Sequence, residues 1–295
     1  MKITGRTNVV GLIGNPVEHS FSPPMHNAAF RALNLDYVYV AFDVEPSNLK
    51  KSIEGAFSLN IKGLNVTIPH KIEVMKYLND LDEIAQLIGA VNTIDFKNLK
   101  GYNTDGIGAI KAIEEVESIK NKNVVIAGAG GASRAISFYI AKYNADKLTI
   151  LNRNVSKAEK LSCDVSNSQL IDDVSFDSIS QIESYLDDAD ILIDTTPVGM
   201  DPHINDKPIV TAENMHEDLV VFDAVYNPNE TVLIKQAIKA GARPVYGIKM
   251  LLYQGAESFK IWTGVDAPID IMEDALRKTL NLKWYYGFNV WCQRF

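Results

Sequence analysis

The feature that most constrains the fold is a glycine-rich stretch within residues 124–153. An apolar run leads into GAGGAS at 128–133, and a helix-like stretch and a second apolar run follow. This order predicts the first βαβ unit of a dinucleotide-binding domain. Gly128 permits the tight turn, and Gly130 lets the backbone approach a pyrophosphate at the helix N-terminus. Ser133 occupies the third small position, a mild departure from Gly or Ala. A simple strand-to-helix connector is the alternative.

The residues that end the second apolar run indicate which cofactor this unit prefers. An NAD-binding unit places Asp or Glu there to hold the ribose 2′-hydroxyl, but this chain has Asn152, Arg153 and Asn154. Arg153 can pair with a 2′-phosphate through a charge-assisted contact, which favours NADP. Asn152 is compatible with either cofactor. The alternative is that Arg153 is a solvated turn residue.

Composition limits the class of protein. The 295 residues are 46% hydrophobic, enough for two domains of ordinary size. The 29 Lys and Arg against 37 Asp and Glu give a net charge of −8, which argues against nucleic acid or an anionic membrane as partner. We find neither a signal sequence nor an apolar run long enough to span a bilayer. Two distant cysteines, Cys163 and Cys292, and five scattered histidines predict a reduced cytoplasmic enzyme without a metal.

The first third of the chain is expected to form a separate α/β unit. Residues 1–105 alternate strand-like and helix-like stretches and contain no glycine fingerprint. The expected strands cover 8–13, 37–44, 61–68 and 90–95.

A polar loop after the first expected strand carries candidate binding groups. Ser20 and Ser22 are two residues apart, so in an extended backbone their hydroxyls point the same way. Paired hydroxyls can bind a small carboxylate or polyol without burying a charge. The alternative is that one serine caps the following helix. We interpret His19 and His26 as structural.

A candidate proton-transfer group follows the third expected strand. Proline suits a first helical turn, so we expect a helix that begins at Pro69 and runs through Tyr77. Lys71 would then lie near a positive helix end, which disfavours the ammonium form. His70 is a rival acid/base, although a helix turns it about 100° away from Lys71. The alternatives are a solvated Lys71 and, further along, an Asp105 that serves only as a helix N-cap.

Seven motifs occur in the order and approximate spacing of shikimate dehydrogenases, which the chain resembles over roughly residues 8–282. The motifs are GNPVEHSFSPPMHN (14–27), NVTIPHK (65–71), GAVNT (89–93), NTDGIG (103–108), GAGGASR (128–134), NRN (152–154) and YQGAESFKIWTG (253–264).

The resemblance implies an α/β fold of two domains with a cleft between them. Residues 1–107 and 248–283 would form a substrate-binding domain, and residues 108–247 a Rossmann-type NADP domain. We assign no role to the aromatic tail at 284–295.

The resemblance also implies an NADP-dependent oxidoreductase acting on a CH–OH group. The reaction would be the reversible NADPH-dependent reduction of 3-dehydroshikimate to shikimate, in aromatic amino acid (chorismate) biosynthesis. The partner would be a small molecule in the cytoplasm, and a homodimer is left open. Two alternatives stay open: a quinate/shikimate dehydrogenase with relaxed cofactor use, and a non-catalytic NADP-binding regulator on the same fold.

The matching motif positions imply roles for individual residues. Lys71 and Asp105 would form the catalytic pair and also contact substrate. The other substrate-binding residues would be Ser20, Ser22, Thr67, Asn92, Tyr226 and Gln254. Cofactor contacts would come from Glu83, Gly128, Ala129, Gly130, Gly131, Ala132, Asn152, Arg153, Asn154, Lys157, Ala224 and Gly247.

Three positions depart from the family pattern. Asn154 stands where the NRT turn has Thr, and Lys157 replaces an Arg, which keeps the charge but loses the bidentate fork. Lys249 replaces the Gly of Gly-Met-Leu. We expect this substitution to bring a bulky charge near the nicotinamide end of the site.

Overall fold

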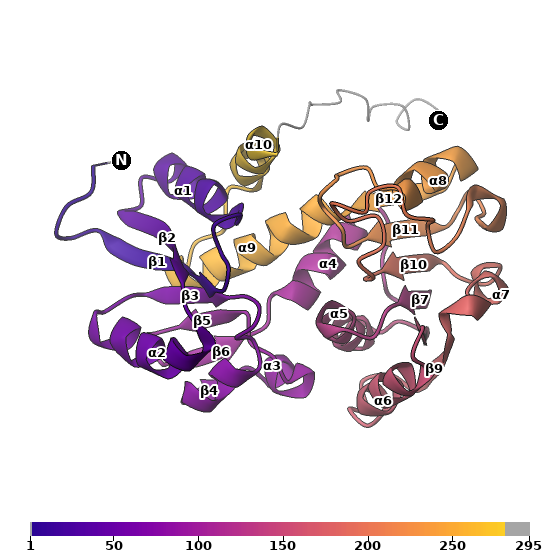
Figure 1. The fold of residues 1–295 in the computed structure, drawn as a ribbon, viewed down its shortest axis with the longest axis horizontal. Coiled ribbons are helices and arrows are strands. Elements are labelled where there is room, and N and C mark those ends of the chain that lie inside the picture. Colours follow the sequence, from indigo (N-terminus) through magenta and orange to yellow (C-terminus); the bar gives the residue numbers. More distant parts are fainter. Residues whose placement is uncertain (1, 281–295) are drawn as a thin grey trace.

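The computed structural model describes residues 2–280, which form two lobes, each built on a six-stranded sheet (Figure 1). Helices cover the faces of both sheets, and the predicted α/β fold of two domains is confirmed. Over the described residues, every helix is too short or too polar to cross a bilayer. The predicted aromatic tail lies outside the described residues.

The first lobe has a mixed sheet with strand order β2-β1-β3-β5-β6-β4. Its strands are β1 (Asn8–Gly14), β2 (Tyr37–Asp43), β3 (Gly63–Val66), β4 (Asp80–Leu81), β5 (Thr93–Asp95) and β6 (Lys100–Tyr102). Its helices are α1 (Ser22–Ala32), η1 (Pro46–Asn48), α2 (Leu49–Ser58), η2 (Glu73–Tyr77), α3 (Glu83–Ile88) and α10 (Ile269–Thr279). Strands β1, β2 and β3 are parallel, whereas β5 runs antiparallel to β3 and β6.

The second lobe has a fully parallel sheet with strand order β12-β11-β10-β7-β8-β9. Its strands are β7 (Asn123–Ala127), β8 (Lys147–Asn152), β9 (Asp173–Ser178), β10 (Ile191–Asp194), β11 (Val220–Asp223) and β12 (Arg243–Tyr246). Its helices are α5 (Gly131–Lys142), α6 (Val155–Ser166), η3 (Ile179–Gln181), α7 (Glu183–Leu186), η4 (Ala212–Asn214) and α8 (Val232–Ala240). The strand order reverses between β7 and β10, and a crevice at such a switch point is where nucleotides bind.

Two helices, α4 (Asp105–Glu114) and α9 (Gly247–Thr263), pack against each other between the lobes (Figure 1). The close approach depends on Gly108, where an added Cβ would lie 2.8 Å from the backbone nitrogen of Gln254 and from the carbonyl oxygen of Met250. Real Cβ contacts are longer than this, so a side chain at 108 would push α9 away. Glycine at this position therefore fixes how near α9 comes to α4.

The predicted helix from Pro69 through Tyr77 is wrong over its first half. Residues 69–72 form turns, and a 3-10 helix covers only Glu73–Tyr77. The carbonyl of Lys71 accepts a hydrogen bond from the Val91 N–H at 2.8 Å instead of a helical partner. The His70 ring is 1% exposed and bonds to the Val44 carbonyl at 2.7 Å, which holds the turn in place. Lys71 therefore does not lie in the first turn of a helix that starts at Pro69.

Candidate active site

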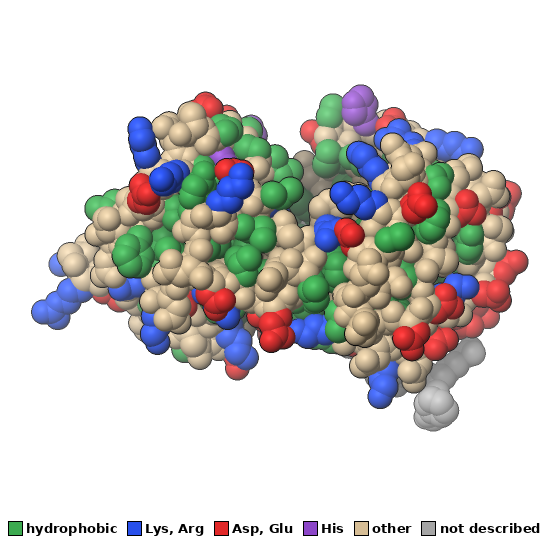
Figure 2. Space-filling view, turned by 90° about the horizontal axis from the view of Figure 1, so that it is seen from below, with side chains coloured by type: hydrophobic (Ala, Val, Ile, Leu, Met, Phe, Trp, Pro, Cys, Tyr) green, Lys and Arg blue, Asp and Glu red, His purple; other side chains and the backbone are tan. Residues whose placement is uncertain are grey.

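A cavity of about 460 Å³ lies between the lobes, and Figure 2 shows the hollow that separates them. The structure brings all eight residues predicted to bind substrate to the wall of this cavity, although they come from distant parts of the chain. They are Ser20, Ser22, Thr67, Lys71, Asn92, Asp105, Tyr226 and Gln254.

Sheet topology explains why the first-lobe residues meet. Ser20 lies in the loop after β1, and Thr67 and Lys71 follow β3, which is parallel to β1. Because β5 is antiparallel to β3, Asn92, immediately before the first residue of β5, lies at the same edge. Strand β6 reverses direction again, so Asp105, just beyond it, returns to that edge.

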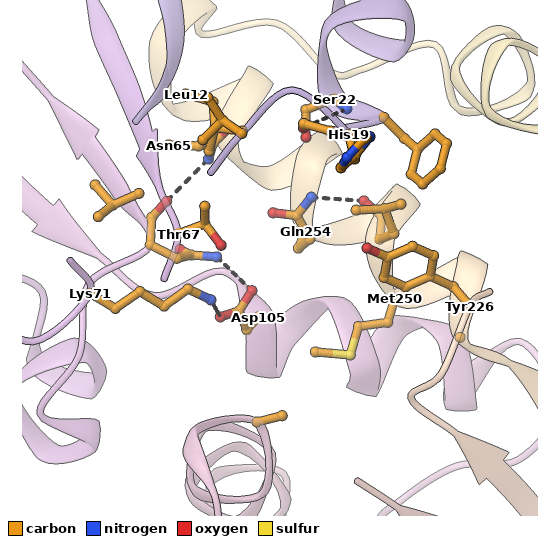
Figure 3. Close-up of a pocket in the computed structure, with 18 of the residues that line it drawn as sticks. Leu12, His19, Ser22, Asn65, Thr67, Lys71, Asp105, Tyr226, Met250 and Gln254 are labelled. Atoms are coloured by element: carbon orange, nitrogen blue, oxygen red, sulfur yellow. Dashed lines mark hydrogen bonds and ion pairs between the residues drawn. The ribbon is translucent and has the colours of Figure 1, made fainter. Parts of the chain in front are cut away.

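The centre of the site is an ion pair between Lys71 and Asp105. The Lys71 Nζ lies 2.6 Å from Asp105 Oδ2, and the Asn92 amide donates to Asp105 Oδ1 at 2.8 Å (Figure 3). The two side chains of the pair are 30% and 18% exposed, so a ligand in the cavity can reach them. Asp105 is the first residue of α4 and Thr104 is the N-cap, so the carboxylate lies at a positive helix end without capping it.

A buried polar network supports Asn92 from behind. The Asn92 side-chain oxygen accepts the Thr104 N–H at 2.7 Å, and the Thr93 hydroxyl bonds to the Ser258 hydroxyl at 2.8 Å. Asn65 donates to the Ser258 hydroxyl at 2.9 Å and accepts from the Tyr39 hydroxyl at 2.8 Å. Satisfied networks of this kind hold side chains in one geometry.

The role of Asn65 as part of the cavity wall was missed from the sequence. Asn65 lines the cavity although it belongs to the buried strand β3. A lone amide inside an otherwise apolar strand was the signal available, since a buried polar side chain needs partners.

Hydroxyl and amide groups gather at the other end of the cavity (Figure 3). The Ser20 hydroxyl accepts the N–H of Ser22, the first residue of α1, at 3.2 Å, and within residues 2–280 the N-cap residue Phe21 makes no side-chain hydrogen bond to this helix. Ser20 therefore satisfies the first N–H of α1, as the alternative of a capping serine expected. The Tyr226 ring packs edge-on against Phe21, with ring centroids 6.0 Å apart, and Tyr226 lies across the cavity from Ser22.

The two histidines in the 14–27 motif differ in position. His19 is exposed and lines the cavity, because the loop after β1 turns the imidazole towards the open site, so this ring is not part of a buried core. His26 is fully buried and stacks on Tyr39 with ring centroids 4.4 Å apart. Burial lowers the pKa of His26 to about 3, which keeps this ring neutral.

The glycine turn has the shape that a pyrophosphate requires. Gly128 has φ of +107°, and an added Cβ would meet the Thr195 hydroxyl at 2.3 Å. At Gly130 and Gly131 a Cβ would point into open space. Over the described residues, the first turn of α5 has neither a side-chain cap nor an acidic residue, so its N–H groups can bind an anion. Ser133, which stands where the fingerprint usually has Gly or Ala, donates its hydroxyl to the Gly128 carbonyl at 2.7 Å. This hydrogen bond closes the glycine turn. These features fit a dinucleotide.

The predicted cofactor contacts fall into three groups. Ala132, Ala224 and Gly247 line the cavity itself. The second group is the turn at 128–131, immediately before Ala132. The third group lies where β8 ends and α6 begins: Asn152 is the last residue of β8, and the exposed Arg153, Asn154 and Lys157 are at the start of α6.

Arg153 and Lys157 place two cations next to the N-terminus of α6. Asn154 is the N-cap of α6 without a side-chain hydrogen bond to it, and the described first turn of this helix has no acidic residue. Positive charge and free N–H groups at one helix end suit a phosphate. Glu83, by contrast, is the exposed first residue of α3 and is not among the described residues that line the cavity.

The expected intrusion of Lys249 into the site is wrong. Its ammonium lies 3.2 Å from a Glu115 carboxylate oxygen and 3.0 Å from a Glu273 carboxylate oxygen, and the neighbouring Met250 lines the cavity instead. Burial raises the pKa of Glu273, but hydrogen bonds from Lys249 and Arg277 outweigh it and lower that pKa overall. Two carboxylates, Glu115 at the C-cap of α4 and Glu273 on α10, therefore hold the lysine away from the cavity.

Comparison with known families covers most of the chain. Residues 12–94 match the shikimate dehydrogenase substrate binding domain, residues 111–230 match shikimate / quinate 5-dehydrogenase, and residues 247–277 match the shikimate 5'-dehydrogenase C-terminal domain.

Individual relatives agree with these matches. A shikimate dehydrogenase (NADP(+)) of Methanobrevibacter smithii is 72% identical over 280 residues, 95% of this chain and 100% of the relative. A solved shikimate dehydrogenase in complex with NADP+ is 52% identical with a TM-score of 0.88, covering 95% and 98% of the two chains. The Listeria monocytogenes shikimate 5-dehydrogenase, in complex with shikimate and NAD, is 36% identical with a TM-score of 0.89, covering 94% and 98%.

Proposed function

Because the chain belongs to the shikimate dehydrogenase family, we propose that it catalyses the reversible NADP-dependent interconversion of shikimate and 3-dehydroshikimate. One observation carries the proposal for this particular chain. The Lys71–Asp105 pair and Ala132, in the first turn after the glycine turn, line the same cavity from opposite lobes. The proposed proton-transfer group and the proposed dinucleotide site therefore face the same cavity.

Lys71 is proposed to move the proton at the reacting oxygen. When bound, NADP supplies the hydride acceptor, and NADPH the hydride donor, at the substrate carbon. During reduction the Lys71 ammonium stabilises the charge that develops on the carbonyl oxygen and gives its proton to it. During oxidation, neutral Lys71 accepts the hydroxyl proton. The Asp105 carboxylate, held by Asn92, keeps the Lys71 nitrogen aimed at this point.

The substrate is proposed to lie along the cavity with its carboxylate at the end opposite Lys71. Ser20, Ser22 and Tyr226 offer hydroxyl donors at that end, which suits a carboxylate without a fixed counter-ion. The ring hydroxyls are proposed to contact Thr67, Asn92, Asp105 and Gln254.

The cofactor is proposed to bind with its pyrophosphate at the 128–132 turn and its 2′-phosphate near Asn152, Arg153, Asn154 and Lys157. The nicotinamide is proposed to lie beside Ala224 and Gly247, which line the cavity. The support is the uncapped N-termini of α5 and α6 and the two exposed cations. Lys157 offers a point charge instead of the bidentate contact that an arginine guanidinium makes with a phosphate. Some use of NAD, which lacks the 2′-phosphate, is therefore compatible with the site.

We also propose the domain division 1–107 with 248–283 against 108–247, a cytoplasmic location and, as the assembly to test, a homodimer. The division is supported by the two separate sheets. Only two cysteines, far apart in sequence, suit a reducing compartment. Strand β2 is an edge strand of the first sheet, and edge strands can pair between copies. Light scattering measures the assembly state.

The experiment that tests the function is the absorbance change at 340 nm, a property of reduced nicotinamide, with the purified protein and four substrate pairs. Shikimate and quinate are each combined with NADP and with NAD. We expect shikimate with NADP to give the highest kcat/KM. Comparable rates with quinate or NAD would favour the relaxed quinate/shikimate enzyme. Binding of NADPH without turnover of any pair would establish the non-catalytic regulator and reject the proposal.

A further inference from the structure

Arg134 follows the glycine turn in sequence but is not among the described residues that line the cavity. It lies in α5, and its backbone N–H donates to the Gly130 carbonyl at 2.9 Å. Its guanidinium reaches into the other lobe, where it donates to the carbonyls of Leu87, at 3.0 Å, and Ile88. A third contact stays within the second lobe, where Nη1 lies 2.5 Å from Asp164 on α6.

The Leu87 and Ile88 carbonyls are at the C-terminus of α3. The last carbonyls of a helix have no partner within it, and a cation there also offsets the negative end of the helix dipole. The guanidinium supplies both effects from α5. Ile84 and Ile88 of α3 pack in the same buried cluster as Ile136 of α5, so apolar contact brings the two helices together beside this polar one.

The segment that Arg134 contacts at Leu87 and Ile88 continues directly into residues that contact Lys71 and Asp105. Three residues after Ile88, the Val91 N–H donates to the Lys71 carbonyl at 2.8 Å. One residue later, the Asn92 amide donates to Asp105 at 2.8 Å. Residues 88–92 therefore connect the guanidinium to the backbone of Lys71 and the carboxylate of Asp105 within five residues.

We propose that Arg134 is a positioning residue that sets the distance between the glycine turn and the Lys71–Asp105 pair. This inference rests on the proposed function, in which the turn holds the hydride carrier and the pair handles the proton. Hydride transfer depends steeply on the separation of the reacting atoms, so a shift of α5 relative to residues 88–92 slows the chemical step. Arg suits the task because its rigid fork serves three acceptors at once, which a lysine ammonium at the same place cannot match.

The test compares three variants. Arg134→Gln removes the charge and the fork, Arg134→Lys keeps the charge, and Asp164→Asn removes only the contact within the second lobe. For each we would measure kcat at saturating substrates, the deuterium isotope effect with shikimate labelled at the oxidised carbon, and the Kd of NADPH by fluorescence. Thermal unfolding of each variant shows that it is folded at the assay temperature.

We expect Arg134→Gln to lower kcat at least about tenfold and to raise the isotope effect, with the Kd of NADPH changed less than about twofold. The kcat of Arg134→Lys should lie between that of Arg134→Gln and that of the unaltered protein. Asp164→Asn should keep its kcat. A purely structural role would lower the unfolding temperature without changing the isotope effect. Unchanged kcat in Arg134→Gln, a loss explained by weaker NADPH binding, or an equal loss in Asp164→Asn would each overturn the inference.

Hydrogen exchange separates this inference from the proposed function, because it needs no turnover. We expect the amides of residues 88–92, Val91 above all, to exchange faster in Arg134→Gln and at an unchanged rate in Asp164→Asn. Unchanged exchange in Arg134→Gln would overturn the positioning role even in an active enzyme. Absent turnover in the unaltered protein would reject the proposed function alone.

Discussion

Replacing Lys71 by alanine tests the centre of the proposed mechanism. The Lys71 Nζ lies 2.6 Å from Asp105 at the cavity wall, and it is the group that we assign to proton transfer. Loss of a positioned acid or base typically slows a reaction about 10²- to 10⁴-fold. At about 1.4 kcal/mol for each tenfold change, the barrier should rise by about 3–6 kcal/mol.

The same structure predicts a small effect of Lys71→Ala on stability. Both side chains of the ion pair are partly exposed, at 30% and 18%, and such pairs contribute about 1 kcal/mol or less. The unfolding temperature should therefore change by only a few degrees. The kcat loss and the stability loss are thus predicted to differ widely, which separates a chemical role from a structural one.

The assay follows absorbance at 340 nm in both directions, with the Kd of NADPH measured by fluorescence. Lys76→Ala is the matched control, because Lys76 forms an ion pair of similar length, 2.7 Å, with Glu73 on the exposed surface nearby. We expect Lys76→Ala to keep its kcat. A Lys71→Ala variant with an unchanged kcat and only a raised KM for shikimate would refute the proton-transfer role.

Three further predictions concern packing, buried charge and cofactor choice. Gly108→Ala should lower both kcat and the unfolding temperature, because its Cβ would lie 2.8 Å from the α9 backbone at Gln254; unaltered values in both assays would contradict this packing. Burial, with the nearby charge of Asp223, raises the pKa of Asp194 to about 7, so the fold loses stability as pH rises from about 4 to about 7, and the full loss is present above about pH 7. Asp194→Asn should therefore stabilise the protein by up to about 4 kcal/mol at pH 8, with the gain shrinking as pH falls towards about 4, measured by denaturant unfolding; an equal gain at both pH values would exclude this cause. Arg153→Ala and Lys157→Ala should each raise the KM for NADP about tenfold and leave the KM for NAD unchanged. Parallel changes in the KM for both cofactors would show that these two residues do not bind the 2′-phosphate.

Local sequence was sufficient to predict the first strand, turn and helix of the second lobe. The apolar runs around residues 128–133 specify strand, turn and helix because each pattern depends on neighbours within a few positions. The positive φ of Gly128 and the uncapped start of α5 agree with that prediction. The ordered motifs also placed Lys71 and Asp105 among the site residues, although residue order alone carries no distance between them.

Tertiary structure decided where the side chains point. Lys71 and Asp105 are 34 residues apart and meet only because β3, β5 and β6 alternate in direction. A hydrogen bond to the Val44 carbonyl, far away in sequence, holds the His70 ring outside the site. The helix expected from Pro69 does not form over residues 69–72. Lys249 was directed away from the cavity by two carboxylates, one at the C-cap of α4 and one on α10. The sequence by itself determined the glycine-turn βαβ unit and the set of chemical groups, because these depend on near neighbours. Only the folded chain decided which groups face one another, because each of those contacts joins residues far apart in sequence.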